Sequence, residues 1–316
     1  MRIDAHMHIN LRNISPDNII GYLDRHRYDR CWLMTCEYLD PKRRSVRKLC
    51  VEHVYEAFLR HPARVIPMYA PDPALDDARE ELLRWFGMGV KGCAELNVTV
   101  GWRSKKMSRL LETVREIGIP VVFRMEHSPE VLKSLDSDTT LEAALLRMMQ
   151  SGRLKGAPGK MLGVLSELWP PLRKWKKLRT VFPGNKLDFA SLRSMLRKHP
   201  ATTFIGHGPL FWRHISDDGR GTGGGEHGPI RKEGMTCSLL RTCPNLYADI
   251  SGPSGFNALD RDHAFSRRFL SEFSHKLLFG TDNYPLSHEE LLRSLRPGPR
   301  VMRRIMGDNA QGLLMQ

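Results

Sequence analysis

The sequence has no apolar run that approaches the ~18–20 residues needed to cross a membrane as a helix. Its six cysteines are scattered and form no C-x-x-C pair, which argues against a thiolate zinc site and against the disulfide framework of a small secreted domain. The first residues lead into a strand-like stretch instead of the apolar core of a secretory signal. With 41% hydrophobic and 27% charged residues, the chain has enough apolar side chains for a substantial core. We therefore predict a folded protein of the cytoplasm without a transmembrane segment.

Acidic residues are scarce in one part of the chain, residues 147–198. This segment holds thirteen lysines and arginines but only Glu167 and Asp188, so it carries +11 of the formal net charge of +14. The run Trp169–Arg179 mixes tryptophan with a dense cationic stretch, which suits an anionic partner such as a lipid surface or a nucleic acid. A solvated lid over acidic loops is the alternative, and no nucleic-acid fold signature accompanies the run.

Short strand-like runs alternate with longer helix-like runs, as expected for a parallel sheet built from βαβ units. Eight such units predict an α/β fold of the TIM-barrel type, with a doubly wound open sheet as the alternative. The predicted strands are Arg2–Ile9, Arg30–Thr35, Arg64–Tyr69, Gly89–Glu95, Ile119–Glu126, Thr202–His207, Asn245–Ile250 and Lys276–Asp282. The predicted helices are one that opens at Ser15 and Pro16 and those over Val46–Arg60, Leu75–Phe86, Met107–Ile117, Leu187–Lys198, Arg261–Phe273 and Val301–Met306.

The connection between the fifth and sixth strands, residues 127–201, is much longer than the loop and helix that a barrel usually places there. We therefore predict one barrel domain over residues 1–316, with residues 136–187 as a basic insertion or lid on the catalytic face. A second loop, residues 217–228, follows the sixth strand and is too rich in glycine for regular structure.

The first predicted strand carries the most informative pattern, IDAHMHI over residues 3–9. Successive side chains of a strand point to opposite faces, so Asp4, His6 and His8 share one face and the apolar residues share the other. In a barrel the apolar set then faces the helices, and both histidines face the interior. Two imidazoles at i and i+2 near the carboxyl end of a strand can bind one cation such as zinc. The alternative to a metal site is that the two histidines occur there by chance.

Two more polar residues follow predicted strands at the same end of a barrel. Asp282 ends the apolar run KLLFGTD, which lies next to the first strand if the barrel closes, so its carboxylate can complete a His/His/Asp set. His207 in FIGHGP is flanked by glycines that leave it sterically open, which suits support of the metal ligands or proton transfer. Taken singly, His207 fits a core histidine and Asp282 a helix cap. Their convergence with the two histidines of the first strand favours a catalytic metal site.

These motifs resemble the amidohydrolase superfamily, in particular the branch of aminocarboxymuconate semialdehyde decarboxylase, the resorcylate-type decarboxylases and related TIM-barrel metal-dependent hydrolases. The similarity runs through most of the chain, in IDAHMHI, GVKGCAELN, IPVVF, TTFIGHGP, NLYADISG, LLFGTDNYP and IMGDNAQGLL. The first and last of these motifs are specific in combination. The resemblance implies a distorted (β/α)8 barrel in which His6, His8 and Asp282 are metal ligands and His207 lines the site.

The sequence departs from this pattern in the fifth strand, where the family usually has a metal-binding histidine and this chain has Arg124. Arginine stays protonated in proteins, so Arg124 cannot coordinate a metal and adds a fixed positive charge. Glu126 has the matching strand parity and is a candidate to bind the metal or to neutralise Arg124, whereas His127 has the opposite parity. Glu95, on a predicted strand face shared with Cys93, is a further candidate for the site.

We predict a metal-dependent hydrolase of the amidohydrolase type that acts on a small anionic substrate. Three protein ligands suffice for a catalytic metal that activates water and polarises a carbonyl group. Zinc is the first candidate, with manganese and iron as alternatives. Asp282 then accepts a proton from the water, His207 stabilises the developing oxyanion, and Arg124 binds a substrate carboxylate. Trp212, just after the sixth strand, and Glu95 are further candidates for substrate contacts.

Two other functions stay open on the sequence alone. A non-oxidative decarboxylase of the same superfamily would use the metal and Arg124 to hold the substrate, while a protonated residue delivers H⁺ to the carbon that loses CO₂. The charge of Arg124 and the uneven charge of the chain instead fit a metal-free protein that binds a partner through residues 147–198. A homodimer is a further hypothesis that no residue pattern decides.

Overall fold

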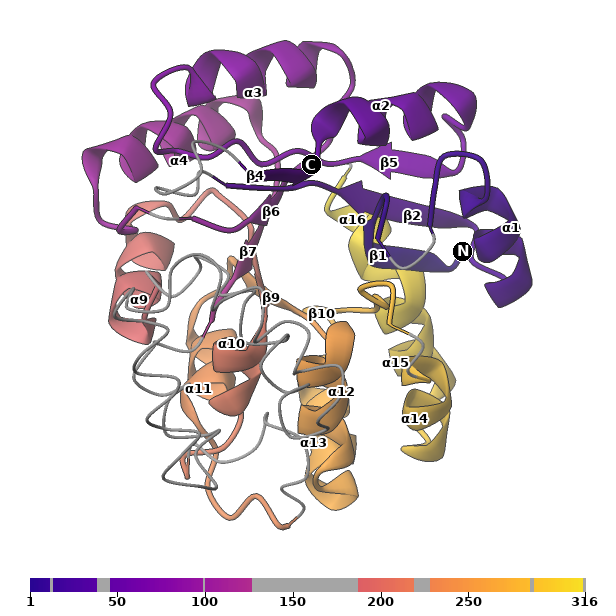
Figure 1. Cartoon of the computed structure of the whole chain (residues 1–316). Helices are drawn as coiled ribbons and strands as arrows, with labels where there is room; N and C mark the ends of the chain where they lie inside the picture. The colour runs from indigo at the N-terminus through magenta and orange to yellow at the C-terminus, as the bar shows by residue number, and fades with distance from the viewer. Residues whose placement is uncertain are drawn as a thin grey trace, which may run out of the picture.

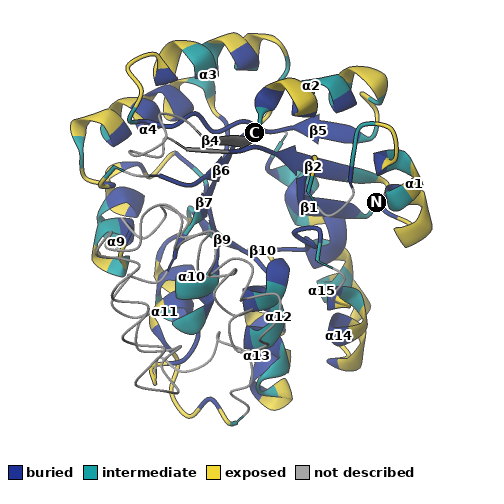
Figure 2. Cartoon of the chain, viewed as in Figure 1, coloured by how far each residue is buried: buried dark blue, intermediate teal, exposed yellow. Residues whose placement is uncertain are grey.

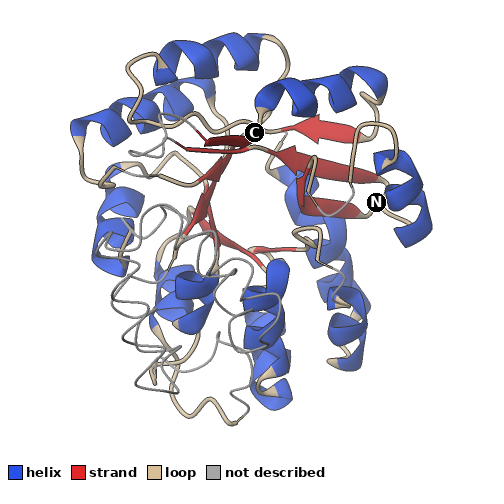
Figure 3. Ribbon diagram, viewed as in Figure 1, coloured by secondary structure: helices blue, strands red, loops and turns tan. Residues whose placement is uncertain are grey.

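A ring of parallel strands surrounded by helices forms the centre of the protein (Figure 1, Figure 3). The computed structural model describes residues 1–11, 14–38, 46–98, 100–126, 187–218, 228–284 and 287–314. Most of the predicted insertion 136–187 and of the basic segment 147–198 lies outside the described residues, so their roles stay predictions. In the part of the chain that is described, no helix is long and apolar enough to cross a membrane.

Each of the eight predicted barrel strands corresponds to a strand of the ring. They are β1 Ile3–His8, β2 Arg30–Met34, β5 Val65–Pro67, β6 Cys93–Leu96, β7 Val121–Arg124, β8 Phe204–His207, β9 Leu246–Asp249 and β10 Leu277–Leu278. Parallel pairing gives the orders β1-β2-β5 and β10-β9-β8-β7-β6. Backbone hydrogen bonds join the two sheets, since Ala5 N donates to Phe279 O at 2.9 Å and Tyr69 N donates to Gly92 O at 3.0 Å. The predicted TIM barrel is confirmed, and the open sheet is excluded.

Helices cover the outside of this ring. They are α1 Ile19–His26, α2 Val51–Arg60, α3 Ala78–Gly87, α4 Lys105–Ile117, α9 Phe189–Lys198, α10 Pro209–Arg213, α11 Met235–Thr242, α12 Gly252–Asp260, α13 His263–Glu272, α14 His288–Ser294, α15 Pro299–Arg303, the π-helix η2 Arg304–Asp308 and α16 Asn309–Gly312. α4 shows how the local sequence sets their bounds. The Ser104 side chain accepts from Met107 N at 3.2 Å at the start, and Gly118 takes the left-handed conformation at the end, with φ of 71°.

Two apolar clusters lie on the two sides of the ring strands, whose residues are buried except for the partly exposed Arg30, Arg124 and Tyr247 (Figure 2). The larger cluster fills the space between the strands and the outer helices. The smaller one fills the inside of the ring, where neighbouring strands contribute Ala5, Met34, Ile66, Ala94, Val122, Ile205 and Leu278. Ala310 and Leu313 at the C-terminus join the inner cluster and close the barrel at the amino ends of the strands. The polar residues are thereby left at the opposite, carboxyl ends.

The alternation predicted for β1 is wrong in its first half. Between Asp4 and Met7, β1 has one residue more than the facing part of β2, which is a β-bulge. Because of this bulge, Ile3 and Ala5 face the inside of the ring instead of the helices. Asp4 is buried against the loop after β10, where its Oδ2 accepts from Thr281 Oγ1 at 2.7 Å. The two histidines still point into the ring.

A similar irregularity interrupts β6 between Cys93 and Leu96. Cys93 belongs to the outer cluster and Ala94 to the inner one, while Glu95 extends into the polar end of the barrel. The predicted common face of Glu95 and Cys93 is therefore wrong, because the bulge breaks the alternation on which it depended.

The predicted helix over Val46–Arg60 is correct only from residue 51 onward. Residues Val46–Leu49 form β4, which pairs antiparallel with β3, Cys36–Tyr38. Cys50 has an extended backbone, with φ of −80° and ψ of 155°, and α2 begins after it. β4 is a strand because it pairs with β3, which lies about ten residues earlier in the chain, and the local sequence alone does not reveal this pairing.

Candidate metal centre

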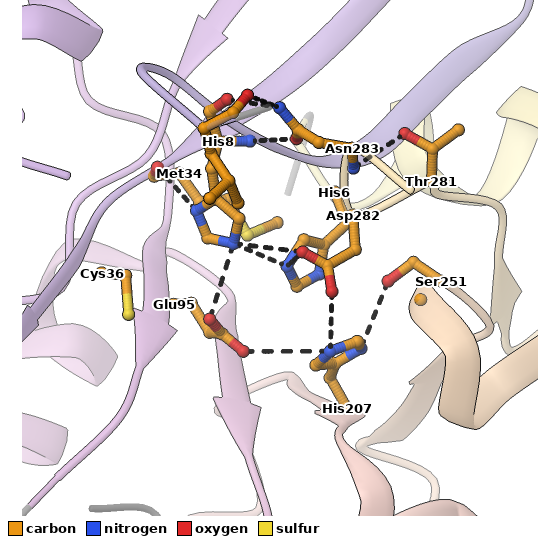
Figure 4. Close-up of polar contacts among 12 residues, drawn as sticks. His6, His8, Met34, Cys36, Glu95, His207, Ser251, Thr281, Asp282 and Asn283 are labelled. Carbon is orange, nitrogen blue, oxygen red and sulfur yellow. Dashed lines mark hydrogen bonds and ion pairs between the residues drawn. The ribbon is translucent and has the colours of Figure 1, made fainter. Parts of the chain in front are cut away.

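The polar residues that the sequence singled out converge at the carboxyl ends of the barrel strands (Figure 4). They are His6 and His8 of β1, Glu95 of β6, Arg124 of β7, His207 of β8 and Asp282 after β10. All but Arg124 are buried. Segments that are far apart in the sequence thus build one polar centre at the mouth of an apolar barrel.

The two histidines of β1 turn their Nε2 atoms toward each other at a distance of 3.1 Å. On the other edges of the rings, His6 Nδ1 lies 2.5 Å from Asp249 Oδ2, and His8 Nδ1 lies 3.1 Å from Met34 O. Both of these oxygens accept hydrogen bonds, so in the neutral rings the hydrogen is on Nδ1 and the lone pair is on Nε2. The pair therefore presents two nitrogen lone pairs to one point.

Asp282 is held at this point by the backbone of β1. Its N–H donates to His6 O at 2.8 Å, and its φ of 53° is a left-handed conformation that few residues other than glycine adopt. Asn283 supports this turn, because its side chain accepts from His8 N at 2.8 Å and donates to His8 O at 2.7 Å. As a result Asp282 Oδ1 lies 3.8 Å from His6 Nε2 and 3.6 Å from His8 Nε2.

Glu95 divides its two carboxylate oxygens between the histidines and Arg124. Its Oε2 lies 3.6 Å from His8 Nε2, and its Oε1 lies 3.4 Å from Arg124 Nη1. Arg124 also forms a close ion pair through Nε with Glu126, and its Nη1 donates to His207 Nε2 at 3.2 Å. Glu126 is thus bound to the guanidinium, whereas Glu95 is the carboxylate that also reaches the histidines.

Two glycines allow His207 to enter the centre. A side chain on Gly206 would collide with an aromatic ring, and Gly208 has φ of 97° and packs against the backbone that follows β7. His207 Nε2 lies 3.9 Å from Asp282 Oδ2, and its ring centre lies 4.4 Å from that of His6. The histidine predicted to line the site therefore touches the same group of residues.

The burial of several charges in one centre shifts their pKa values. Burial opposes the charge of Glu95, but Arg124 and the histidines outweigh it and lower the pKa of Glu95 to about 2. Burial also opposes the charge of His6, yet the Asp249 carboxylate raises its pKa to about 9. Burial and the neighbouring His6 lower the pKa of His8. The raised pKa favours a proton on His6 Nε2 in the metal-free protein, and a bound cation would replace that proton.

The donor set fits a divalent cation. Among the described residues, His6, His8 and Glu95 form one group whose ligand atoms lie within 4.8 Å of one another, and His6, His207 and Asp282 form another. Imidazole nitrogen and carboxylate oxygen are ligands that zinc, manganese and iron accept. The described part of this centre contains four buried carboxylates, those of Glu95, Glu126, Asp249 and Asp282, and a single guanidinium, so a cation offsets a surplus of negative charge.

A family model described as Amidohydrolase matches residues 3–314. The chain belongs to the amidohydrolase family. The match includes every residue of the centre, and it confirms the resemblance that the motifs indicated. As an amidohydrolase, the protein is an enzyme.

Solved structures share the fold of this amidohydrolase at low sequence identity. A probable 2-pyrone-4,6-dicarboxylic acid hydrolase from Acinetobacter baumannii with citric acid bound has a TM-score of 0.54 at 12% identity, over 100% of this chain and 99% of its own. A dihydroxybenzoic acid decarboxylase from Polaromonas sp. JS666, with bound manganese and the inhibitor 2-nitroresorcinol, has a TM-score of 0.55 at 14% identity, over 99% and 96%. An uncharacterised TIM-barrel protein from Bordetella bronchiseptica has a TM-score of 0.57 at 12% identity, over 99% and 98%. A search of curated proteins finds no match.

Asp249 and Asn283 also build the centre of this amidohydrolase, although the sequence did not single them out. Asp249 lies one residue before the end of the predicted strand Asn245–Ile250 in NLYADISG, and that position at the mouth of the barrel was the available signal. Asn283 had no such signal, because its role depends on contacts with β1. Trp212, predicted to contact substrate, is fully buried and donates its indole N–H to Asp249 O at 2.9 Å. His127 lies outside the described residues.

Proposed function

We propose that this amidohydrolase is a metal-dependent hydrolase that acts on a small anionic substrate through activated water. The observation that carries the proposal is the convergence of His6 Nε2, His8 Nε2 and Asp282 Oδ1, which lie 3.1–3.8 Å apart. A divalent cation bound there supplies Lewis acidity and makes water a nucleophile at neutral pH. Zinc is the first candidate, because two imidazoles and carboxylates form a common zinc ligand set, and manganese and iron are the alternatives.

We assign the ligands from the contacts of each side chain. His6, His8 and Asp282 bind the metal, and Glu95 takes the place of the fifth-strand histidine that the family usually has. The guanidinium of Arg124 has no lone pair to offer a metal. Glu126, bound to that guanidinium, serves to neutralise it.

The remaining atoms of these side chains supply the steps of hydrolysis. The Oδ2 atom of Asp282 is turned toward His207 Nε2 at 3.9 Å, and it accepts a proton from the attacking water. The N–H groups of Arg124 lie on the same side and stabilise negative charge that develops on the substrate oxygen, and His207 Nε2, which accepts from Arg124 Nη1 at 3.2 Å, orients them. The barrel mouth thus holds an acceptor for the proton and donors for the oxyanion.

Arg124 supports an anionic substrate. Its side chain is 16% exposed, whereas Glu95 beneath it is 2% exposed, so the guanidinium is the charged group nearer to solvent. Arginine binds carboxylates through two parallel hydrogen bonds. The names of two solved neighbours agree with this class of substrate, since one is a dicarboxylic acid hydrolase with citric acid bound and the other a dihydroxybenzoic acid decarboxylase.

Decarboxylation is the second candidate activity. It is supported by Arg124, which can hold the carboxylate that leaves as CO₂, and by the fold shared with a dihydroxybenzoic acid decarboxylase. The two reactions differ in the fate of water, which enters the product only in hydrolysis.

Metal analysis and isotope labelling test the proposal. Protein purified without chelator is expected to hold about one equivalent of divalent metal, and the double variant His6→Ala/His8→Ala to hold none. The metal-loaded protein is then assayed with esters and lactones of aromatic di- and tricarboxylic acids and with hydroxybenzoates. Oxygen-18 from labelled water in the product identifies a hydrolase, whereas CO₂ without labelled product identifies a decarboxylase. Wild-type protein that binds none of zinc, manganese or iron after reconstitution contradicts the metal site.

A further inference from the structure

One carboxylate of the centre contacts imidazoles from two different strands. Asp249, at the end of β9, has its Oδ2 2.5 Å from His6 Nδ1 and 3.3 Å from His207 Nδ1. Only 1% of Asp249 is exposed. Asp249 therefore offers one carboxylate oxygen to the edges of both rings that face away from Asp282.

Ser251 connects the same carboxylate to His207. The Ser251 N–H donates to Asp249 Oδ1 at 2.8 Å, and the hydroxyl donates to Asp249 Oδ2 at 2.9 Å. Ser251 Oγ also lies 3.2 Å from His207 Nδ1. A hydroxyl has one hydrogen, and here it points to the carboxylate, so the oxygen accepts from His207 Nδ1–H.

The contact of Arg124 with the other edge of the His207 ring also places the ring hydrogen on Nδ1. Its Nη1 lies 3.2 Å from His207 Nε2, and guanidinium nitrogens only donate. The Nε2 atom must therefore accept, which again places the hydrogen of the neutral ring on Nδ1. Contacts on both edges of the ring agree.

We propose that Asp249 is a positioning residue that holds both His6 and His207 with the hydrogen on Nδ1, so that both Nε2 lone pairs face the centre. This inference rests on the proposed function for His6 as a metal ligand, but the form of His207 does not depend on it. The carboxylate acts directly on His6 and both directly and through Ser251 on His207. Without it, His6 is free to carry its hydrogen on Nε2, where it blocks the lone pair, and His207 loses the acceptor on Nδ1 that complements the Arg124 contact on Nε2.

Metal affinity tests the action of Asp249 on His6. Asp249→Asn keeps the shape of the side chain but replaces one acceptor oxygen with an NH2 donor, so it cannot accept both from the Ser251 N–H, which contacts Oδ1, and from the two rings, which contact Oδ2. Competition with a chelating dye for Mn²⁺ and Zn²⁺ is expected to show about 10–100-fold weaker binding than in wild-type protein. Ser251→Ala removes the hydroxyl contacts with Asp249 and His207 but leaves the direct contact between Asp249 and His6, so it is expected to weaken metal binding much less than Asp249→Asn. Asp4→Asn is the matched control, because Asp4 is an equally buried carboxylate whose contacts are with Thr281 and the His6 backbone.

Nitrogen-15 NMR of histidine-labelled full-length protein tests the action of Asp249 on His207 without metal or substrate. Long-range proton–nitrogen spectra, with signals assigned by His207→Gln, are expected to show hydrogen on Nδ1 and none on Nε2 of His207. Asp249→Asn and Ser251→Ala are expected to change this signal, and Asp4→Asn to leave it unchanged. In zinc-loaded wild-type protein the His6 signal is expected to show the same Nδ1–H form.

Two results overturn the positioning role. One is hydrogen on His207 Nε2 in the wild-type protein. The other is a folded Asp249→Asn variant, judged by circular dichroism, whose metal affinity and His207 signal equal those of the wild type. A wild-type protein that shows the His207 form but binds no metal contradicts the proposed metal site, while it supports the action of Asp249 on His207.

Discussion

Replacing Arg124 with methionine tests how the centre balances its charges. The guanidinium contacts Glu95 at 3.4 Å, His207 at 3.2 Å and, in a close ion pair, Glu126. Methionine retains an unbranched apolar stem but removes the positive charge. Two buried carboxylates are then left without the cation that neutralises them.

The expected loss of stability follows from this geometry. At 3.4 Å and an effective dielectric constant of about 20, the attraction between Arg124 and Glu95 is about 5 kcal/mol. Removing one partner of a buried ion pair costs about 3–5 kcal/mol in the free energy of unfolding, because the other charge stays buried. A bound cation recovers part of this loss, since a ligand at about 100 times its Kd adds about 2.7 kcal/mol. That gain is expected to be larger in the variant, where Arg124 no longer repels the metal.

Urea unfolding with and without manganese measures both effects. Arg241→Met is the matched control, because Arg241 contacts Glu233 at 3.0 Å and Glu272 at 2.7 Å but is 47% exposed. We expect it to cost at most about 1 kcal/mol and to leave the manganese effect unchanged. The reasoning is refuted if Arg124→Met is as stable as the wild type without metal, or if manganese stabilises the variant no more than the wild type.

Three further predictions concern acid stability, the support of Asp282 and thiol reactivity. The folded-state pKa of Glu95, about 2, lies below its usual 4.5, so about 3 kcal/mol of stability is present above pH 4.5 and is lost as the pH falls toward 2. The unfolding free energy of Glu95→Gln should therefore fall less steeply over this pH range than that of the wild type. Equal slopes for the two proteins contradict the pKa shift. Asn283→Ala removes the side-chain hydrogen bonds to the His8 backbone, so it should lower the free energy of unfolding in urea by about 1–3 kcal/mol and weaken manganese binding. Unchanged manganese binding would show that this turn does not position Asp282. Cys50 is partly exposed and the other five cysteines are buried, so one thiol of the native protein should react rapidly with an aromatic disulfide reagent, and two or more rapid equivalents would contradict the burial.

The barrel could be predicted because each strand is a short, largely apolar run, and, except between the fifth and the sixth, these runs follow one another at similar distances. The eight predicted strands all appear, and helices such as α4 end at glycines that the sequence displays. The bulges in β1 and β6 could not be predicted, because an extra residue is defined only by the register with a neighbouring strand. The β3–β4 hairpin was missed for the same reason.

The candidate site shows the same division. His6, His8, His207 and Asp282 stood out because polar side chains at the carboxyl ends of apolar barrel strands lie where such barrels place their catalytic residues. Their distances from one another, and the contact of Glu95 with both a histidine and Arg124, depend on how the ring closes. The role of Glu126 as the partner of Arg124 was one of two alternatives, and only the ion pair distinguishes them.

The sequence by itself determined the alternation of strands and helices, the family and the chemical types of the site residues, since these are properties of local pattern and composition. Only the tertiary structure decided which polar atoms face one another. Asp249 is the clearest case, because a carboxylate at the end of β9 gains its role from imidazoles of β1 and β8 that are separated from it by 243 and 42 residues. Hydrogen-bond direction depends on such contacts, and these exist only after the barrel has closed.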